Sequence, residues 1–101
     1  MTYLPEKSNI SITSSDSPVA AIVSSHYSSN TSGGAITFNL PALSAVPDSK
    51  VITIKLNTAG NNLTLTPNGS DTIEGSSSYI MSIAKESVTC VAASGTNWEI
   101  I

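Results

Sequence analysis

The chain has 101 residues, of which 40% are hydrophobic and only 11% are charged, and its formal net charge is −3. This length predicts one domain with a single modest core. Four basic residues are too few for the basic patch that nucleic-acid binding requires, and the longest apolar runs are much shorter than a membrane span. We therefore expect neither nucleic acid nor a membrane as a partner.

The first third of the chain is rich in serine and carries a weak strand pattern. Residues 1–7, MTYLPEK, show no alternation of apolar and polar side chains, which predicts an extended arm that a partner orders. Two weaker strand candidates follow, around Ile10–Thr13 and Val19–Ser24. We accordingly expect an arm with a first strand over residues 1–17 and a compact knob over residues 18–101.

From residue 35 onwards, apolar residues alternate with polar ones in short runs. The runs are AITFNL, VITIKLN, LTLT, YIMSI, VTCVAA and NWEII. A period of two with many β-branched residues predicts half-buried strands, and the Gly-, Pro-, Asn- and Ser-rich segments between the runs predict turns. Only ALSAVP and IMSIAKES have room for a helical turn. The chain is therefore predicted to be all-β, a sandwich or a barrel.

The stretch NGSDTIEG, residues 68–75, holds two acidic residues that invite a metal-binding or catalytic interpretation. A calcium loop needs about six oxygen ligands at fixed positions, and the residues after Asp71 do not supply them. A hydrolase needs two carboxylates facing each other across a cleft, whereas Asp71 and Glu74 are three residues apart in a turn. We interpret the stretch as a corner in which Asp71 binds local backbone amides, Ile73 enters the core and Gly75 takes an unusual backbone angle.

Three residues that occur once each were weighed as functional groups. His26 has Ser24, Ser25 and Asp16 nearby in sequence, but no nucleophile elbow accompanies them, so we expect His26 at the surface or in a subunit contact. Cys90 alternates with apolar residues and is predicted to lie in the core. Trp98 is interpreted as a core or interface anchor in preference to a sugar-stacking platform. The sequence thus predicts no enzymatic activity, no catalytic residue, no cofactor and no metal.

Several apolar residues fall on the second faces of the predicted strands, opposite the residues expected in the core. They are Val51, Ile80, Val91 and Ile101. A small domain with exposed apolar side chains gains stability by associating with copies of itself. We therefore expect these four residues at a subunit interface.

Three stretches with recognisable short motifs follow one another along the chain: ITFNLPALSAVPDSKVITIK, NNLTLTPNGSDTIEG and SSYIMSIAKESVTCVAASGTNWEII. They contain Leu-Pro-Ala, Ile-Lys, Thr-Pro, Gly-Ser-Asp-Thr-Ile-x-Gly and Gly-Thr-Asn-Trp followed by aliphatic residues. This ordered set, over residues 35–101, resembles a domain that recurs in bacteriophage fibre, spike and head-decoration proteins. Members of that family form compact β-sandwich knobs that look trimeric. The resemblance therefore implies a small antiparallel β-sandwich with a jelly-roll-like arrangement.

The resemblance implies two alternative functions. The first is a structural virion protein, a homotrimeric capsid decoration (cement) protein on the outer surface of a phage head, with Tyr3 and Leu4 of the arm contacting the major capsid protein. The second is a receptor-binding knob of a tail fibre or spike that recognises a glycan on the host surface. The short chain favours the first function, because an adsorption fibre normally needs reach.

Overall fold

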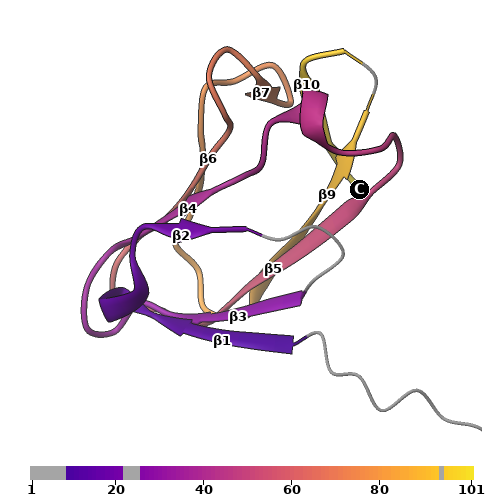
Figure 1. Cartoon of the computed structure of the whole chain (residues 1–101). Coiled ribbons are helices and arrows are strands. Elements are labelled where there is room, and N and C mark those ends of the chain that lie inside the picture. The colour runs from indigo at the N-terminus through magenta and orange to yellow at the C-terminus, as the bar shows by residue number, and fades with distance from the viewer. Residues whose placement is uncertain (1–8, 22–25, 94) are drawn as a thin grey trace, which may run out of the picture.

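The computed structural model describes residues 9–21, 26–93 and 95–101, which form two β-sheets and two short 3-10 turns (Figure 1). Sheet A contains, in spatial order, β1 (Asn9–Thr13), β3 (His26–Asn30), β5 (Val51–Thr58), β9 (Glu86–Ala92), β10 (Asn97–Ile100) and β7 (Thr72–Ile73). Sheet B contains β2 (Val19–Ala20), β4 (Ile36–Asn39), β6 (Leu63–Thr66) and β8 (Tyr79–Met81). The 3-10 turns are η1 (Ser14–Asp16) and η2 (Leu43–Ala45).

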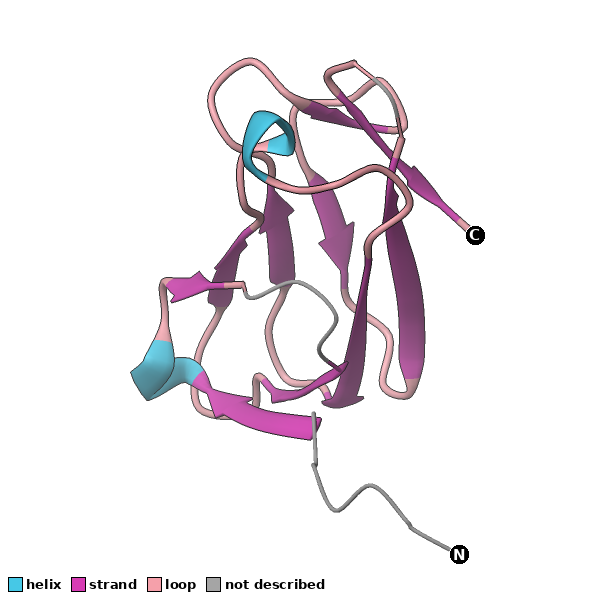
Figure 2. Ribbon diagram, turned by 45° about the vertical axis from the view of Figure 1, so that its right-hand side comes forward, coloured by secondary structure: helices cyan, strands magenta, loops and turns pink. Residues whose placement is uncertain are grey.

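The first six strands alternate between the two sheets, so the chain winds around the space between them (Figure 2). Each turn of the winding places a new strand parallel to the one before it in the same sheet. His26 of β3 lies opposite Asn9 of β1, which is 17 residues earlier (26 − 9). Leu63 of β6 lies opposite Ile36 of β4, 27 residues earlier (63 − 36). The winding then stops, because β8 and β9 pair antiparallel with β6 and β5.

The all-β prediction is confirmed, but the antiparallel arrangement is wrong for most strand pairs. Of the eight pairings among the described strands, five are parallel and three are antiparallel. A jelly roll is built from antiparallel neighbours, so the parallel pairs also depart from the jelly-roll-like prediction. The physical reason is that alternation with period two is the same for both directions. Parallel neighbours need a crossover connection, and here a strand of the opposite sheet provides it.

Each of the six predicted runs contains a strand, and ALSAVP contains the turn η2. The strand β3 was not predicted, because its sequence HYSSN holds one apolar residue and was assigned to a serine-rich link. The alternation in YIMSI predicts Tyr79, Met81 and Ile83 on one face of a strand, and this is wrong for Ile83. Strand β8 ends at Met81, and Ile83 lies in the following turn with 69% of its surface exposed.

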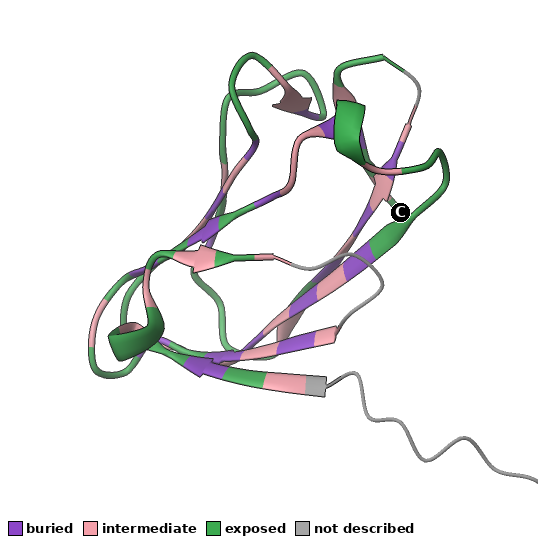
Figure 3. Cartoon of the chain, in the orientation of Figure 1, coloured by how far each residue is buried: buried purple, intermediate pink, exposed green. Residues whose placement is uncertain are grey.

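The inward side chains of both sheets form one apolar core (Figure 3). Ile52, Ile54 and Leu56 of β5 face it from sheet A, and the alternate residues of β4 and β6 face it from sheet B. The rings of Tyr27 and Phe38 meet edge to face across the two sheets, with centroids 4.6 Å apart and an angle of 82° between their planes. Edge-to-face contact is a favoured geometry for aromatic pairs.

The N-terminal segment joins this core as far as it is described. Strand β1 pairs with β3, and Ile12 is buried in the common core. The second weak strand candidate is confirmed for Val19–Ala20 alone, since residues 22–25 lie outside the described residues. Residues 1–8, with the predicted capsid contacts Tyr3 and Leu4, also lie outside the described residues.

Candidate functional site

The acidic corner is built from contacts between distant parts of the chain. The backbone amide of Leu43, the first residue of η2, donates a hydrogen bond of 2.9 Å to Oδ2 of Asp71. The Asp71 amide itself donates to the carbonyl of Asn68 at 2.9 Å, which closes a tight turn. The expectation that the Asp71 carboxylate binds local amides is therefore wrong, because its partner lies 28 residues away in the sequence.

Glu74 serves a different element from Asp71. Its Oε2 accepts a hydrogen bond of 2.6 Å from the amide of Ile100, and its own amide donates to the carbonyl of Trp98 at 2.8 Å. These two bonds hold the corner against β10. Glu74 takes a positive φ of 50°, and Gly75 follows with a φ of 81°, an angle that glycine adopts without a steric penalty.

Asn97 completes the corner as an acceptor for two donors. Its Oδ1 receives the amide of Gly75 at 2.9 Å and the hydroxyl of Thr72 at 2.8 Å. Ile73 is fully buried beneath these contacts, as predicted. The corner thus attaches η2 and β10 to one end of the core, and its acidic side chains are held by backbone amides of two separate elements.

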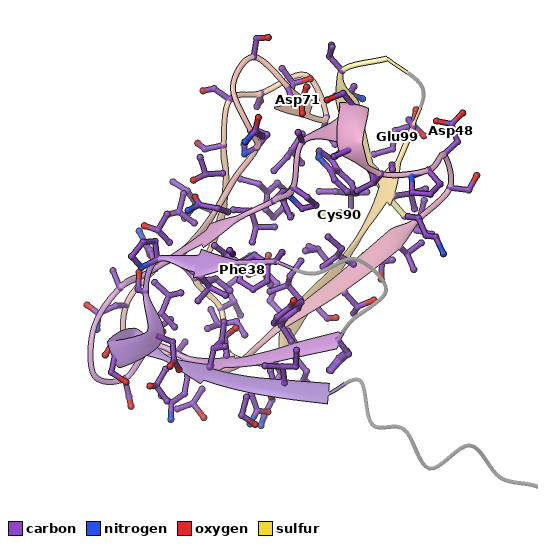
Figure 4. The ribbon with its side chains drawn as sticks, in the orientation of Figure 1. Phe38, Asp48, Asp71, Cys90 and Glu99 are labelled. Carbon is purple, nitrogen blue, oxygen red and sulfur yellow. The ribbon has the colours of Figure 1, made fainter. Side chains whose placement is uncertain are left out.

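The other acidic side chains near the corner do not form a cluster with Asp71. Figure 4 shows the labelled acids Asp71, Asp48 and Glu99 all in the upper part of the view, with Asp71 set apart from the other two. Within the described ranges, no group of three His, Cys, Asp or Glu side chains lies close enough to hold a metal ion, and no pocket is found.

His26 lies on the outer face of sheet A, where β3 pairs with Thr53 of β5. Its position at the surface agrees with the sequence prediction. Asp16, which the sequence placed near it, accepts a hydrogen bond of 2.9 Å from the amide of Thr13 at the end of β1. Ser24 and Ser25 lie outside the described part of the chain.

Cys90 and Trp98 are both fully buried, which confirms their placement in the core. Figure 4 shows Cys90 and Phe38 in the space between the sheets. Burial raises the pKa of the Cys90 thiol from 9.0 to about 11, and the negative charge of Glu74 contributes to the rise. A thiol with a raised pKa carries little thiolate at neutral pH, so Cys90 is protected from the reactions of the thiolate.

Three of the four predicted interface residues come together on the outer face of sheet A. Val51 of β5 lies directly opposite Val91 of β9, and Glu99 of β10 lies on the other side of Val91. Ile101 follows β10 and donates its amide to the carbonyl of Thr89 at 3.0 Å, next to Val91. We name Val51, Val91 and Ile101 the outer apolar strip; Val51 is 38% exposed and Ile101 79%.

The fourth predicted residue, Ile80, lies on the outer face of sheet B opposite Thr64 and is 56% exposed. It is therefore separated from the outer apolar strip by the whole core. The described structure does not bring the four residues to one surface. Ile83 is a further exposed apolar residue. The alternation in YIMSI predicted it on the same face as Met81, but the turn after Met81 interrupts that alternation.

The remainder of the outer face of sheet A is mostly hydroxyl-bearing. Thr53 and Thr89 lie side by side, and their Oγ1 atoms are 3.3 Å apart. Ser28, Lys55 and Ser87 form the next row across β3, β5 and β9. Sequence reasoning missed the contribution of β3 to this face. The signal available was the alternation of Tyr27, Ser29 and Thr31, all of which are buried.

Comparison with models of protein families and with curated proteins finds no match for this chain. None of the helical segments in the described ranges has the length and apolar content needed to cross a membrane.

Replacing Asp71 by Ala is expected to lower the free energy of unfolding by about 1–2 kcal/mol, because the Leu43 amide loses a charged acceptor in a half-buried position. The matched control is Asp48→Ala, which removes an exposed acid of the same type and is expected to change the stability by less than about 0.5 kcal/mol. Urea unfolding followed by Trp98 fluorescence measures both. Equal stabilities of the two variants would contradict the bracing role of Asp71.

Cys90 is expected to make stability depend on pH between about 9 and 11. In this window the unfolded thiol releases its proton while the folded one keeps it, so the unfolded state is favoured as pH rises. Wild type should therefore lose stability relative to Cys90→Ala between pH 9 and 11, although both chains share every other titrating group. Urea unfolding at several pH values measures the difference, and two parallel pH profiles would show that burial does not hold the proton.

Proposed function

We propose that this chain is a structural protein of a bacteriophage particle, a homotrimeric decoration (cement) protein that binds the outer surface of the head and stabilises it. The resemblance of residues 35–101 supports the class of protein. The observation that carries the proposal is the outer apolar strip, because it places exposed apolar side chains next to one another on the outer face of sheet A. Two sheets that share one apolar core support a β-sandwich knob of the kind that family forms.

A three-fold arrangement suits the outer apolar strip. Val51 and Val91 form a cross-strand pair on long, central strands of sheet A, so their side chains are held in fixed positions. Near a three-fold axis, the strip of each copy meets those of two neighbours, and about 25 cal/mol is gained for each Å² of apolar surface removed from water. Across the contact, the nearby hydroxyl groups of Thr53 and Thr89 can replace their hydrogen bonds to water with hydrogen bonds to hydroxyl groups of a neighbouring copy.

Attachment to the head is assigned to the segment that precedes β1. Residues 1–7 carry Tyr3 and Leu4, apolar side chains that fit preformed pockets on the major capsid protein. Ordering such a segment has an entropic cost, and apolar anchors offset that cost. The knob then stays on the outside of the virion.

The alternative function, a receptor-binding knob that recognises a glycan, has less support from the described residues. Trp98 is the chain's single tryptophan and is fully buried, and Tyr27 is buried as well. Neither ring is accessible for stacking on a sugar. This burial favours the decoration protein over the glycan-binding knob.

Replacing Val51 by Lys is expected to convert the trimer into a monomer, because three ammonium groups would be brought together where apolar side chains meet. The matched control is Ile80→Lys, the same kind of change on the outer face of sheet B, which should leave a trimer. Light scattering measures the mass, and circular dichroism checks that both variants are folded. A wild-type monomer at every concentration would remove the main physical support for the proposal, and loss of the trimer in Ile80→Lys alone would move the interface to sheet B.

Deleting residues 1–7 is expected to leave a folded trimer that no longer binds the head. The assay mixes the truncated and the full-length chains separately with phage heads that lack this component and measures the bound chain after sedimentation. Undiminished binding of the truncated chain would show that the knob itself makes the attachment. Binding of neither chain to the heads would contradict the decoration function.

A further inference from the structure

The two described sheets have four outer edge strands, and three of them are protected. In sheet B, β2 has two residues and follows Pro18, and β8 has three residues. In sheet A, β7 has two residues. Natural proteins protect sheet edges from foreign strands by shortness, proline and charge. The fourth edge strand, β1, has five residues and contains neither proline nor a charged side chain.

The hydrogen bonds of β1 show which of its backbone groups face away from β3. The amide of Thr13 donates to Oδ2 of Asp16 at 2.9 Å, so it points away from β3 and is satisfied within the turn η1. Peptide groups two residues apart in a strand point to the same side. Ser11 therefore presents its amide and carbonyl on the open side of β1, where no described strand lies. The edge is closed at Thr13 and open at Ser11.

The core is also less completely covered at this end of the winding. Ile10 of β1 and Val19 of β2 pack against the core but remain half-buried. At the other end, Ile73, Met81 and Trp98 are fully buried under the closing strands. A strand added beside β1 would place an inward side chain next to Ile10 and extend the cover.

We propose that β1 pairs, antiparallel, with the β1 of a second copy of this chain around a two-fold axis at Ser11. The sequence Asn-Ile-Ser-Ile-Thr has the same order of polar and apolar residues in both directions about Ser11, so the strand is complementary to itself. Ser11 would exchange two backbone hydrogen bonds with Ser11 of the partner subunit. Ile10 would lie opposite Ile12 of the partner subunit on the core side, and no like charges would meet.

This contact is independent of the proposed trimer. The trimer uses the outer face of sheet A, whereas the pairing uses its free edge, so one chain can make both contacts. In a trimeric particle each β1 edge would join one trimer to another, and in a monomer it would form a dimer. A single strand pair is a small interface, so the association is expected to be weak and to depend on protein concentration.

The test uses charge at the two-fold axis in the full chain. Ser11→Lys and Ser11→Glu each place like charges opposite each other in the pair, and Thr37→Lys is the matched control on an exposed position of the interior strand β4. Sedimentation velocity over a range of concentrations measures association, with circular dichroism as the folding control. Wild type and Thr37→Lys should associate beyond their smallest particle as concentration rises, to a doubled mass if that particle is a monomer and to a doubled or larger mass if it is a trimer. Each Ser11 variant should associate about five-fold more weakly.

A 1:1 mixture of the Ser11→Lys and Ser11→Glu chains should restore the association, because opposite charges then meet. Amide exchange gives an independent measurement: the Ser11 amide should become protected as wild-type concentration rises, while the Thr13 amide, already bound to Asp16, should not change. Wild type that never associates beyond its smallest particle, Ser11 variants that associate like wild type, or a mixture that stays dissociated would overturn the pairing. The mass of the smallest particle, one chain or three, reports separately on the proposed trimer.

Discussion

The structure depends on one constraint, which is that neither sheet can bury its apolar face without the other. The chain meets this constraint by crossing from one sheet to the other after nearly every strand, so that each turn of the winding extends both halves of the core together. Parallel neighbours follow from this path. The two ends of the winding then differ, because antiparallel strands follow the winding at one end, while at the other end the described sheets stop at β1 and β2, which pair in parallel.

The closed end also explains where some of the few charged residues are used. The carboxylates of Asp71 and Glu74 accept hydrogen bonds from backbone amides of η2 and β10. These two elements do not pair with each other in a sheet. A charged acceptor makes a stronger hydrogen bond than a neutral one. With acids used in this way and only four bases in the chain, the outer faces offer hydroxyl and apolar groups to a partner.

The sequence predicts local structure well and spatial neighbours poorly, for physical reasons that particular residues illustrate. The alternation in VITIKLN and VTCVAA identified β5 and β9, because half-buried strands require it. The same alternation carries no information on direction, so the parallel pairs were missed. Strand β3 was missed because Ser29 and Thr31 occupy buried positions that usually hold apolar residues. For the candidate site, the burial of Ile73 was predictable from its place between two turns. The partner of Asp71 was not, since Leu43 lies 28 residues away.

The winding has a consequence for how fast the chain can fold. Among the described strands, β9 and β10 are the only consecutive strands that pair with each other; every other pairing joins segments separated by at least one further strand. Long loops must therefore close before most ladder hydrogen bonds can form, and closing them costs conformational entropy. Proteins dominated by contacts between distant residues fold in milliseconds to seconds, much more slowly than those rich in local contacts. The β9–β10 hairpin is the natural starting point, and from it β5, then β3 and then β1 can add to sheet A in their spatial order.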